Sequence, residues 1–530
     1  MNWKTTIIKI GIMLLAIYPI TASAQDTDNL PSITDFKTVN VDGRQLLQIP
    51  LKDVLYWALQ RSGDIRSARM DIDSARSRLI AEMESSDMTL TNNITQGRAL
   101  NLAGTNLNGS SDSPYLTYNS ANSLTRSSQL SKKDSNGILY SLKYSSQSTL
   151  SKLHTIEKQG ASSNESDLDD ELETSALTFG VSVPLFKGWG NVNQTEENKS
   201  RVRVQQAEWS TEQTKLTLLN LIADTYWNLV GLWEKKRVAQ KAVELSEKLY
   251  AENKERAKLG ILKLIEVKQT AIQLNRNKLT VLDAERSIRE VEDQLKILLG
   301  VEDIPYGFIP SETPSVQAIE DNIDTMEEAV LKHSPELGLI EGNLEINRLD
   351  TEKAVNDDAT DLDLDLAYTL NGAGDSISSG SDGWSDRNLN TYSVGITWTI
   401  PLGDKRATES IHRKRLEQAQ LDIQKNDTRS KLRSELRTLV RSLDFARENI
   451  TTNEEQYELA EQILNEEIEK MKLGKSRSYL VSEAQQDQIE AKLGVINAQI
   501  NYEKTYFSIL LKTGKVYQAY RLQSQDQTGE

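Results

Sequence analysis

The chain has 530 residues, a formal net charge of −16, a mean hydropathy of −0.52 and no cysteine. The lack of cysteine excludes disulfides, thiolate metal sites and a cysteine nucleophile, and the acidic balance argues against nucleic acid as a partner. The chain has 3 histidines, which are too scattered for a catalytic triad or a multi-histidine metal site. We therefore expect a protein that is not an enzyme and that holds no cofactor or metal.

The N-terminus has the pattern of a secretory signal peptide. Two lysines precede an apolar run over residues 10–17, and Ala22-Ser23-Ala24 supplies a small-residue cleavage site. We expect residues 1–24 to be removed and residues 25–50 to form an N-terminal periplasmic extension. Beyond the signal peptide no apolar stretch approaches the ~18 residues of a membrane-spanning helix, so only a closed β-barrel would allow the chain to cross a bilayer.

Two tracts without proline predict long helices, because proline breaks helix interiors. These tracts are residues 185–304 and 402–530. Apolar residues recur in both at spacings of three and four, as in a coiled-coil seam. The seam positions are Leu219, Ile222, Tyr226, Leu229 and Trp233 in the first tract and Leu432, Leu436, Leu439 and Leu443 in the second. Gly260 and Gly474 interrupt the tracts near their middles, so each tract is expected to fold as a helical hairpin.

The chain also contains an internal repeat. Gly260 and Gly474 lie 214 residues apart, and so do Gly300 and Gly514 at the ends of the two helical hairpins. Upstream, Val183-Pro184-Leu185 corresponds to Ile400-Pro401-Leu402. The predicted divisions are a first repeat over 51–300, a connector over 301–325, a second repeat over 326–515 and a C-terminal tail over 516–530.

Each repeat is expected to carry one β-hairpin. In the second repeat, apolar and polar residues alternate over 361–370 and again over 393–400. One face of such a hairpin suits lipid and the other suits a wet lumen, whereas a soluble sheet with one buried face is the alternative. Even small closed barrels use about eight strands, so four strands per chain would enclose a pore only in an oligomer.

The hairpin of the first repeat is less clearly defined by the sequence. Residues 177–183 form its second strand, and the partner strand is either 86–97 or 137–150. The stretches 101–136 and 159–175 are rich in Ser, Asn and Gly, and we expect exposed loops there. The first repeat is thus predicted as a helix, a β-hairpin with a long extracellular loop, and a helical hairpin.

With this architecture the sequence resembles the TolC-like family of outer-membrane efflux and secretion channels over roughly residues 45–520. Two repeats of helix, strand pair and helical hairpin carry the resemblance, together with the turns followed by Glu266-Val267 and Glu483-Ala484. It implies a mainly α fold with a membrane β-barrel part, in which a homotrimer forms a 12-stranded β-barrel in outer-membrane lipid and a periplasmic α-barrel. It also implies a passive channel subunit of a tripartite efflux or type I secretion system.

The resemblance further implies partners and sites. The partners are a periplasmic adaptor (membrane fusion) protein and an inner-membrane RND or ABC pump. The residues that match the adaptor-binding periplasmic tip are Lys258, Leu259, Gly260, Ile261, Leu262, Lys472, Leu473, Gly474, Lys475 and Ser476.

Two acids match the narrow aperture inside the tip. Glu483 is a candidate for a carboxylate ring, with a solvated surface glutamate as the alternative, and Leu480 replaces a second acid of such rings. Glu266 holds the equivalent place in the first repeat, where a surface salt bridge is the alternative.

An interfacial aromatic belt of the barrel is expected from five residues, with ordinary packing of each side chain as the alternative: Trp189, Tyr368, Trp384, Tyr392 and Trp398. The competing hypothesis for the whole chain is a soluble periplasmic coiled-coil adaptor or scaffold.

Overall fold

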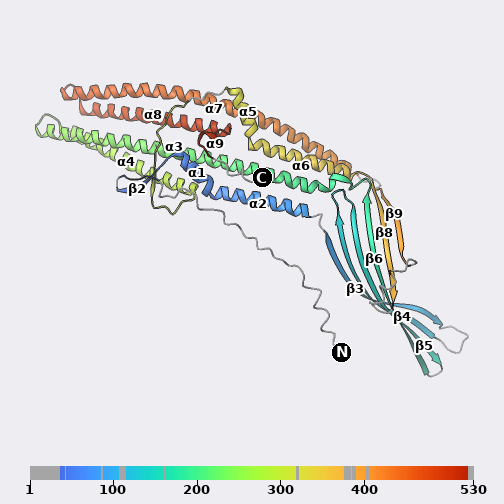
Figure 1. Ribbon diagram of the computed structural model, residues 1–530. Coiled ribbons are helices and arrows are strands. Elements are labelled where there is room, and N and C mark those ends of the chain that lie inside the picture. The colour runs from blue at the N-terminus through green and yellow to red at the C-terminus, as the bar shows by residue number, and fades with distance from the viewer. Residues whose placement is uncertain are drawn as a thin grey trace.

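The computed structural model describes residues 36–41, 43–84, 88–106, 115–159, 162–317, 322–374, 384, 389–400 and 405–522. Long helices lie side by side at one end of an elongated molecule, and a large antiparallel sheet forms the other end (Figure 1). The predicted signal peptide, Pro401 and Leu402 lie outside the described residues, as do most of the N-terminal extension before the first strand and the last eight residues of the tail.

Four long helices form two antiparallel hairpins, as expected from the proline-free tracts. The first consists of α3 (Thr195–Lys258) and α4 (Leu264–Leu299), and the second of α7 (Arg406–Lys472) and α8 (Ser478–Lys512). With 64 residues, α3 is roughly 96 Å long at about 1.5 Å per residue. No helix in the described part of the chain has the length and apolar character needed to span a bilayer.

Shorter helices cover the sheet-proximal half of these rods. α1 (Leu51–Arg61) and α2 (Gly63–Glu84) pack on α3, while α5 (Ile323–His333) and α6 (Pro335–Asp357) pack on α7. The start of α6 is well specified, because the Ser334 hydroxyl accepts a hydrogen bond from the Leu337 amide and Pro335 occupies the first turn. A last short helix, α9 (Val516–Ala519), follows α8.

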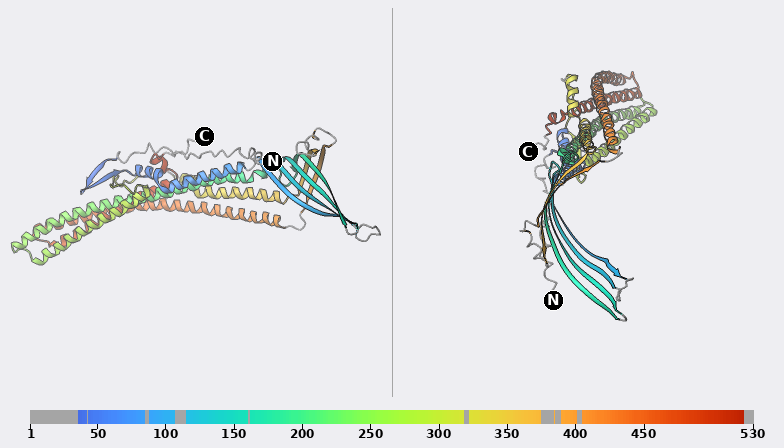
Figure 2. Two further views of the ribbon diagram at one scale, coloured as in Figure 1. Left: turned by 90° about the horizontal axis from the view of Figure 1, so that it is seen from below. Right: turned by 90° about the vertical axis from the view of Figure 1, so that its right-hand side faces the viewer.

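The large sheet has six antiparallel strands in the order β3-β4-β5-β6-β8-β9. Their bounds are Thr89–Asn106 for β3, Tyr115–Lys133 for β4, Leu139–Gln159 for β5, Ser162–Pro184 for β6, Asp361–Gly374 for β8 and Thr391–Thr399 for β9. The second repeat supplies the single hairpin predicted for it. The sheet as a whole is curved (Figure 2).

The first repeat contributes four of these strands, and the expectation of one hairpin there is wrong. Both alternatives for the partner strand, 86–97 and 137–150, fall largely within strands, which are β3 and β5. The stretches 101–136 and 159–175 are also mostly strand, not loop, because continuous ladders with β4 and β6 satisfy their backbone groups. Their polar residues were misleading because a strand beyond an apolar layer can be polar on both faces.

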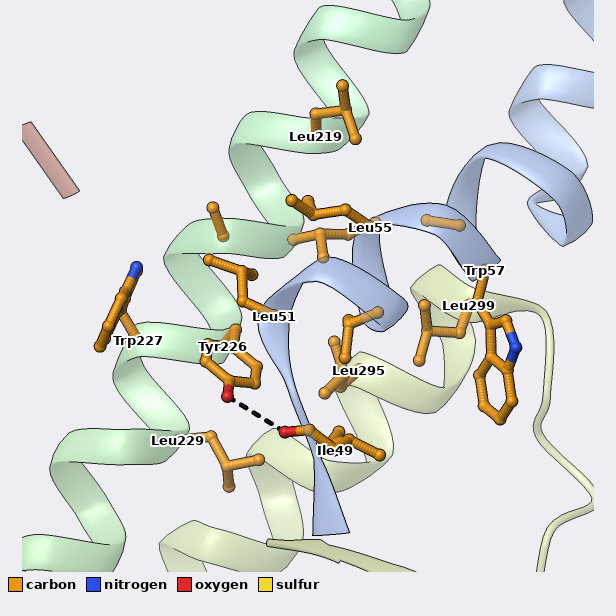
Figure 3. Close-up of a cluster of buried hydrophobic side chains, with 14 of the residues drawn as sticks. Ile49, Leu51, Leu55, Trp57, Leu219, Tyr226, Trp227, Leu229, Leu295 and Leu299 are labelled. Carbon is orange, nitrogen blue, oxygen red and sulfur yellow. Dashed lines mark hydrogen bonds between the residues drawn. The ribbon is translucent and has the colours of Figure 1, made fainter. Parts of the chain in front are cut away.

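A second, small sheet joins the N-terminal extension to the connector. Its strands β1 (Thr38–Val41), β2 (Arg44–Ile49) and β7 (Gly307–Pro310) lie in the order β1-β2-β7. The main hydrophobic core lies beside it, where residues of α1, α3 and α4 meet (Figure 3). Within this core the Tyr226 hydroxyl donates to the Ile49 carbonyl at 3.1 Å. The core therefore fixes the extension and the connector against the middle of the helical rods.

Candidate functional site

One face of the six-stranded sheet is apolar across all of its strands. A single row of directly paired residues crosses the sheet, and every member is apolar or aromatic: Leu90, Leu130, Leu142, Phe179, Tyr368 and Tyr392. We call the face that carries this row the apolar face. Most of its side chains are exposed in the single chain, with Tyr392 at 83% and Val394 and Ile396 both at 68%. An exposed apolar surface of this extent needs a non-aqueous neighbour.

The apolar face has a defined height on β8. Leu362, Leu364, Leu366 and Leu370 lie on it, and the distance from the first to the last is roughly 26 Å at about 3.3 Å per residue. Beyond Leu370, in the direction away from the helices, the same face becomes polar. There Arg126 pairs with Ser146, and Glu173 is buried and accepts a hydrogen bond from the Ser146 hydroxyl at 2.6 Å.

Aromatic residues lie at both borders of this face. Tyr368 and Tyr392 are paired neighbours toward the outer border, whereas Trp398 is paired with Leu362 next to the helices. Trp189, on the turn between β6 and α3, is also exposed. The structure therefore brings Tyr368, Tyr392 and Trp398 to one face of the sheet.

Trp384, which was also expected in the aromatic belt, contacts two strands of the sheet. Its indole N–H donates to the Ser175 hydroxyl at 3.1 Å, and its ring meets Tyr144 edge-on with 6.1 Å between centroids. Trp384 lies between β8 and β9 in the chain and packs against β5 and β6.

The opposite face of the sheet, which we call the polar face, is rich in small hydroxyl and amide side chains. On β3 to β5 it carries Thr91, Asn93, Thr95, Ser123, Thr125, Ser127, Ser141, Ser145 and Gln147. On β8 it carries Asp361, Asp363 and Asp365, and the Asp365 carboxylate accepts from Ser182 at 2.7 Å and from Thr397 at 3.1 Å. Within the described ranges no cluster of acidic or histidine side chains could hold a metal ion.

The ten predicted tip residues lie in the two helix turns farthest from the sheet (Figure 1). Leu259, Ile261 and Leu473 are exposed by 70% or more. Both turn glycines have positive φ, +77° for Gly260 and +69° for Gly474, which only glycine adopts without strain. The turns therefore present apolar side chains to solvent on tightly defined backbones.

The flanking residues of each turn are held by local ion pairs. Lys258 pairs with Glu255 at 2.5 Å, and Lys472 pairs with Glu469 at 2.7 Å. The Ser476 hydroxyl donates to Glu467 at 2.5 Å. Leu262 is half-buried and Lys475 is exposed.

The two aperture candidates differ in burial. Glu483 is exposed, next to Ala484, which is buried, and Glu266 is half-buried in the first turn of α4. Neither carboxylate forms an ion pair with a residue of the described chain. The surface salt bridge considered for Glu266 is therefore not observed within this chain.

A buried polar network joins the two helical hairpins behind their tips. Gln485 of α8 donates to the Ala242 carbonyl of α3 at 2.9 Å and accepts from the Ser246 hydroxyl at 3.2 Å. Asn277 of α4 donates to the same hydroxyl at 2.7 Å. Nearer the tips, Leu249, Leu464, Met471, Val481 and Ala484 form a small apolar cluster. These contacts make the two hairpins one unit within the chain.

Three helices are tied together where the rods meet the sheet. Asp350 of α6 accepts from Lys199 of α3 at 2.9 Å and from Lys414 of α7 at 3.1 Å. Burial opposes ionisation of Asp350, but the hydrogen bonds and charges of these two lysines lower its pKa. The lysines in turn pair with Glu196 and Glu417.

Two carboxyl groups, the half-buried Glu312 and the buried Glu503, were not predicted from the sequence. Both oxygens of Glu312 accept from the Leu51 amide at the start of α1, at 3.1 and 3.0 Å, and Glu503 accepts from the Ser315 amide at 2.7 Å. Burial raises the pKa of each carboxyl group. No local pattern marks them, because their partners are far away in the sequence.

Comparison with known proteins gives matches to one family and to one fold. Residues 141–301 match the family model described as outer membrane efflux protein. No curated protein sequence matches the chain.

Among solved structures, the CmeC outer membrane channel of Campylobacter jejuni matches with a TM-score of 0.61 and 15% identity, over 90% of this chain and 90% of that chain. The outer membrane protein VceC from Vibrio cholerae matches with a TM-score of 0.60 and 15% identity, over 88% of this chain and 96% of that chain. The open state of the Neisseria gonorrhoeae MtrE outer membrane channel matches with a TM-score of 0.58 and 14% identity, over 87% of this chain and 88% of that chain. The resemblance predicted from the sequence is therefore confirmed: the chain has the fold of these outer-membrane channels, and its residues 141–301 carry the signature of the outer membrane efflux protein family.

Proposed function

We propose that this chain is a subunit of an outer-membrane channel that passively exports substrates from a periplasm-spanning pump complex, as part of a tripartite efflux or type I secretion system. The apolar face of the sheet is the observation that supports this most. Its height of roughly 26 Å on β8 is close to the ~25 Å apolar band of outer-membrane barrels. The polar face, rich in hydroxyl groups, suits a water-filled lumen on the other side of the same strands.

Closure of such a channel requires several copies of the chain. Six strands are fewer than the roughly eight of the smallest closed barrels. In the described sheet, β3 and β9 each have one neighbouring strand and one unpaired edge. In our proposal three copies surround one axis, so that their sheets form a barrel in the outer membrane and their helical hairpins form a periplasmic tunnel.

The two helix turns are proposed to bind a periplasmic adaptor protein, which links the channel to an inner-membrane RND or ABC pump. The exposed Leu259, Ile261 and Leu473 support this, because exposed apolar side chains on an ordered turn are typical of protein contacts.

Glu483, and in the first repeat Glu266, are proposed to lie at the aperture just inside the tip. Three copies of Glu483 around one axis would attract cations. We expect Glu483→Gln to reduce the cation preference of the reconstituted trimer, measured as a reversal potential in a salt gradient. The matched variant Gln486→Glu adds a carboxylate at an exposed position of the same helix. It distinguishes an effect of a carboxylate at the aperture from an effect of the total charge of α8. An unchanged preference in Glu483→Gln would exclude this role.

Fractionation of cells that express the full chain tests the channel itself. We expect heat-modifiable trimers in the outer membrane, because β-barrels and their oligomers resist detergent until they are heated. Release of the chain with the soluble periplasmic proteins would overturn the proposal and favour the soluble coiled-coil adaptor or scaffold.

A further inference from the structure

The number of strands per chain sets the width of a barrel shared between copies. The hairpin of β3 and β4 is continuous with the rest of the sheet, since β4 pairs with β5 from Tyr115–Glu157 to Lys133–Leu139. The hairpin is therefore not folded away as a separate loop. The apolar row also crosses it, through Leu90 and Leu130. All six strands thus have the properties of one continuous wall.

The two free edges are suited to pair with each other in different copies. Strands alternate in direction along the sheet, so β3 leads away from the helices and β9 leads back toward them. The β9 edge of one copy can therefore form an antiparallel ladder with the β3 edge of the next. Both edges lie in a curved sheet (Figure 2). The strand registers place the apolar residues of β3 and β9 that belong to the apolar row on one face. Pairing in this way keeps the apolar face continuous between copies.

Building on the proposed channel function, we propose that three copies of six strands close an 18-stranded barrel by pairing β9 with β3 of the next copy. The 12 strands predicted from the sequence assumed four strands per chain, and the described sheet has six. Since barrel diameter grows roughly linearly with strand number, the lumen is about 1.5 times as wide as that of a 12-stranded barrel.

The side chains of the polar face leave this lumen open. On β3 to β5 they are mainly Ser, Thr, Asn and Gln, which are short and uncharged. Barrels of 16 to 18 strands enclose an aqueous channel when large side chains or plugs do not fill them. The barrel is therefore suited to hydrated, hydrophilic solutes too large for a 12-stranded pore.

Disulfide cross-linking in the full chain tests the pairing of the edges, and the chain has no native cysteine to interfere. Ser393→Cys on β9 is combined in turn with Thr91→Cys, Asn93→Cys or Thr95→Cys on β3, all on the polar face. We expect disulfide-linked dimers and trimers for at least one pair. The matched control is Ser145→Cys on β5, at the level of Asn93 in the sheet. Links from β9 to β5 between copies, with none to β3, would show a 12-stranded barrel and overturn the inference.

The width of the barrel lumen is measured independently in single-channel recordings. Poly(ethylene glycol) of increasing size is added on the barrel side, and the smallest polymer that no longer enters the lumen gives the excluded radius. β3 and β5 begin at the same end of the sheet, so deletion of residues 89–138 joins α2 directly to β5 and leaves four strands. We expect the excluded radius of this variant to fall to about two thirds of the full-length value. Equal excluded radii in the deletion variant and the full-length chain would overturn the inference. If the deletion variant does not fold, the disulfide cross-links alone decide between 12 and 18 strands. Absence of both conductance and trimers from the full-length chain would instead refute the proposed channel function.

Discussion

At the scale of single residues, α6 packs on α3 through a glycine. A Cβ atom added at Gly338 would lie 2.5 Å from ring atoms of Trp209, whereas one added at Gly342 would meet the flexible side chain of Gln206 at 2.6 Å. Both glycines lie in the interior of the same helix, where alanine is favoured over glycine by about 1 kcal/mol. Their different neighbours therefore decide the effect of the same substitution.

We expect Gly338→Ala to lower the free energy of unfolding by about 1 to 3 kcal/mol. The added methyl group would force the rigid indole of Trp209 to shift, and this shift would disturb the packing around the indole. Gly342→Ala is the matched control and is expected to be less destabilising, since the flexible Gln206 side chain can shift, although it then loses its hydrogen bonds to the Leu339 carbonyl and Asn343. Denaturant unfolding of the detergent-solubilised protein measures both. Equal destabilisation by the two variants would contradict this account of the α3–α6 contact.

The half-buried Glu312 predicts a pH dependence of stability. Partial burial, with a contribution from the charge of Asp53, raises its pKa despite the hydrogen bond from the Leu51 amide and the nearby Tyr226 hydroxyl. A folded-state pKa above the unfolded value means that this group's stabilising effect is complete below the unfolded pKa of about 4.3 and is lost as the pH rises through the folded pKa. Glu312→Gln removes this dependence.

The difference in unfolding temperature between Glu312→Gln and the wild type should therefore be more positive at pH 7 than at pH 4. Glu302→Gln, at an exposed position of the same connector, controls for loss of one negative charge. A difference that is independent of pH would show that Glu312 titrates as it does in the unfolded chain.

At the scale of elements, adjacent residues of the strand β9 lie on opposite faces of the sheet. Val394 lies on the apolar face and Ser393 on the polar face. A lysine on the lipid side of a barrel costs about 2 to 4 kcal/mol near the bilayer midplane, whereas lumen-side changes are tolerated. Val394→Lys should therefore sharply reduce the yield of heat-resistant trimers in the outer membrane, while Ser393→Lys should leave it close to the wild-type level.

Gel analysis of membrane fractions measures this difference. A similar yield for the two variants would mean that the apolar face does not contact lipid.

The helices were predictable from the sequence, but only part of the sheet was. Residues 361–370 and 177–183 alternate apolar and polar side chains, and both lie in strands as expected. β4 and the outer half of β6 lack a regular alternation, because much of their length lies past the apolar layer and is mainly polar, with isolated leucines such as Leu168 and Leu172 on β6. The half-buried Glu312 and the buried Glu503 could not be predicted for a different reason: their environment depends on contacts between distant segments of the chain.

At the scale of the whole molecule, the junction between rods and sheet depends on Asp350. Because Lys199 and Lys414 lower its pKa, the stabilisation is present above the unfolded Asp pKa of about 3.9 and is lost as the pH falls through the folded pKa. Asp350→Asn should lower the free energy of unfolding by about 1 to 3 kcal/mol at pH 7, since hydrogen bonds to charged groups are lost.

At pH 2 to 3 the two proteins should become more similar in stability. Asp357→Asn, at the exposed end of the same helix, is the control, because Lys353 is its ion-pair partner within α6. A stability difference that persists at low pH would show that Asp350 acts through packing and not through its charge.

The position of the α3–α4 hairpin between β6 and β8 has a consequence for the order of folding. Val183 pairs directly with Leu364, although both long helices lie between these residues in the chain. Closing so long a loop is entropically costly and slow when the intervening chain is unfolded. The α3–α4 hairpin returns the chain only part of the way, because α4 has 36 residues and α3 has 64. α6, which packs on α3 and directly precedes β8, covers the remaining distance to the sheet. The two halves of the sheet should therefore join only after the first helical hairpin has formed and α6 has packed against it.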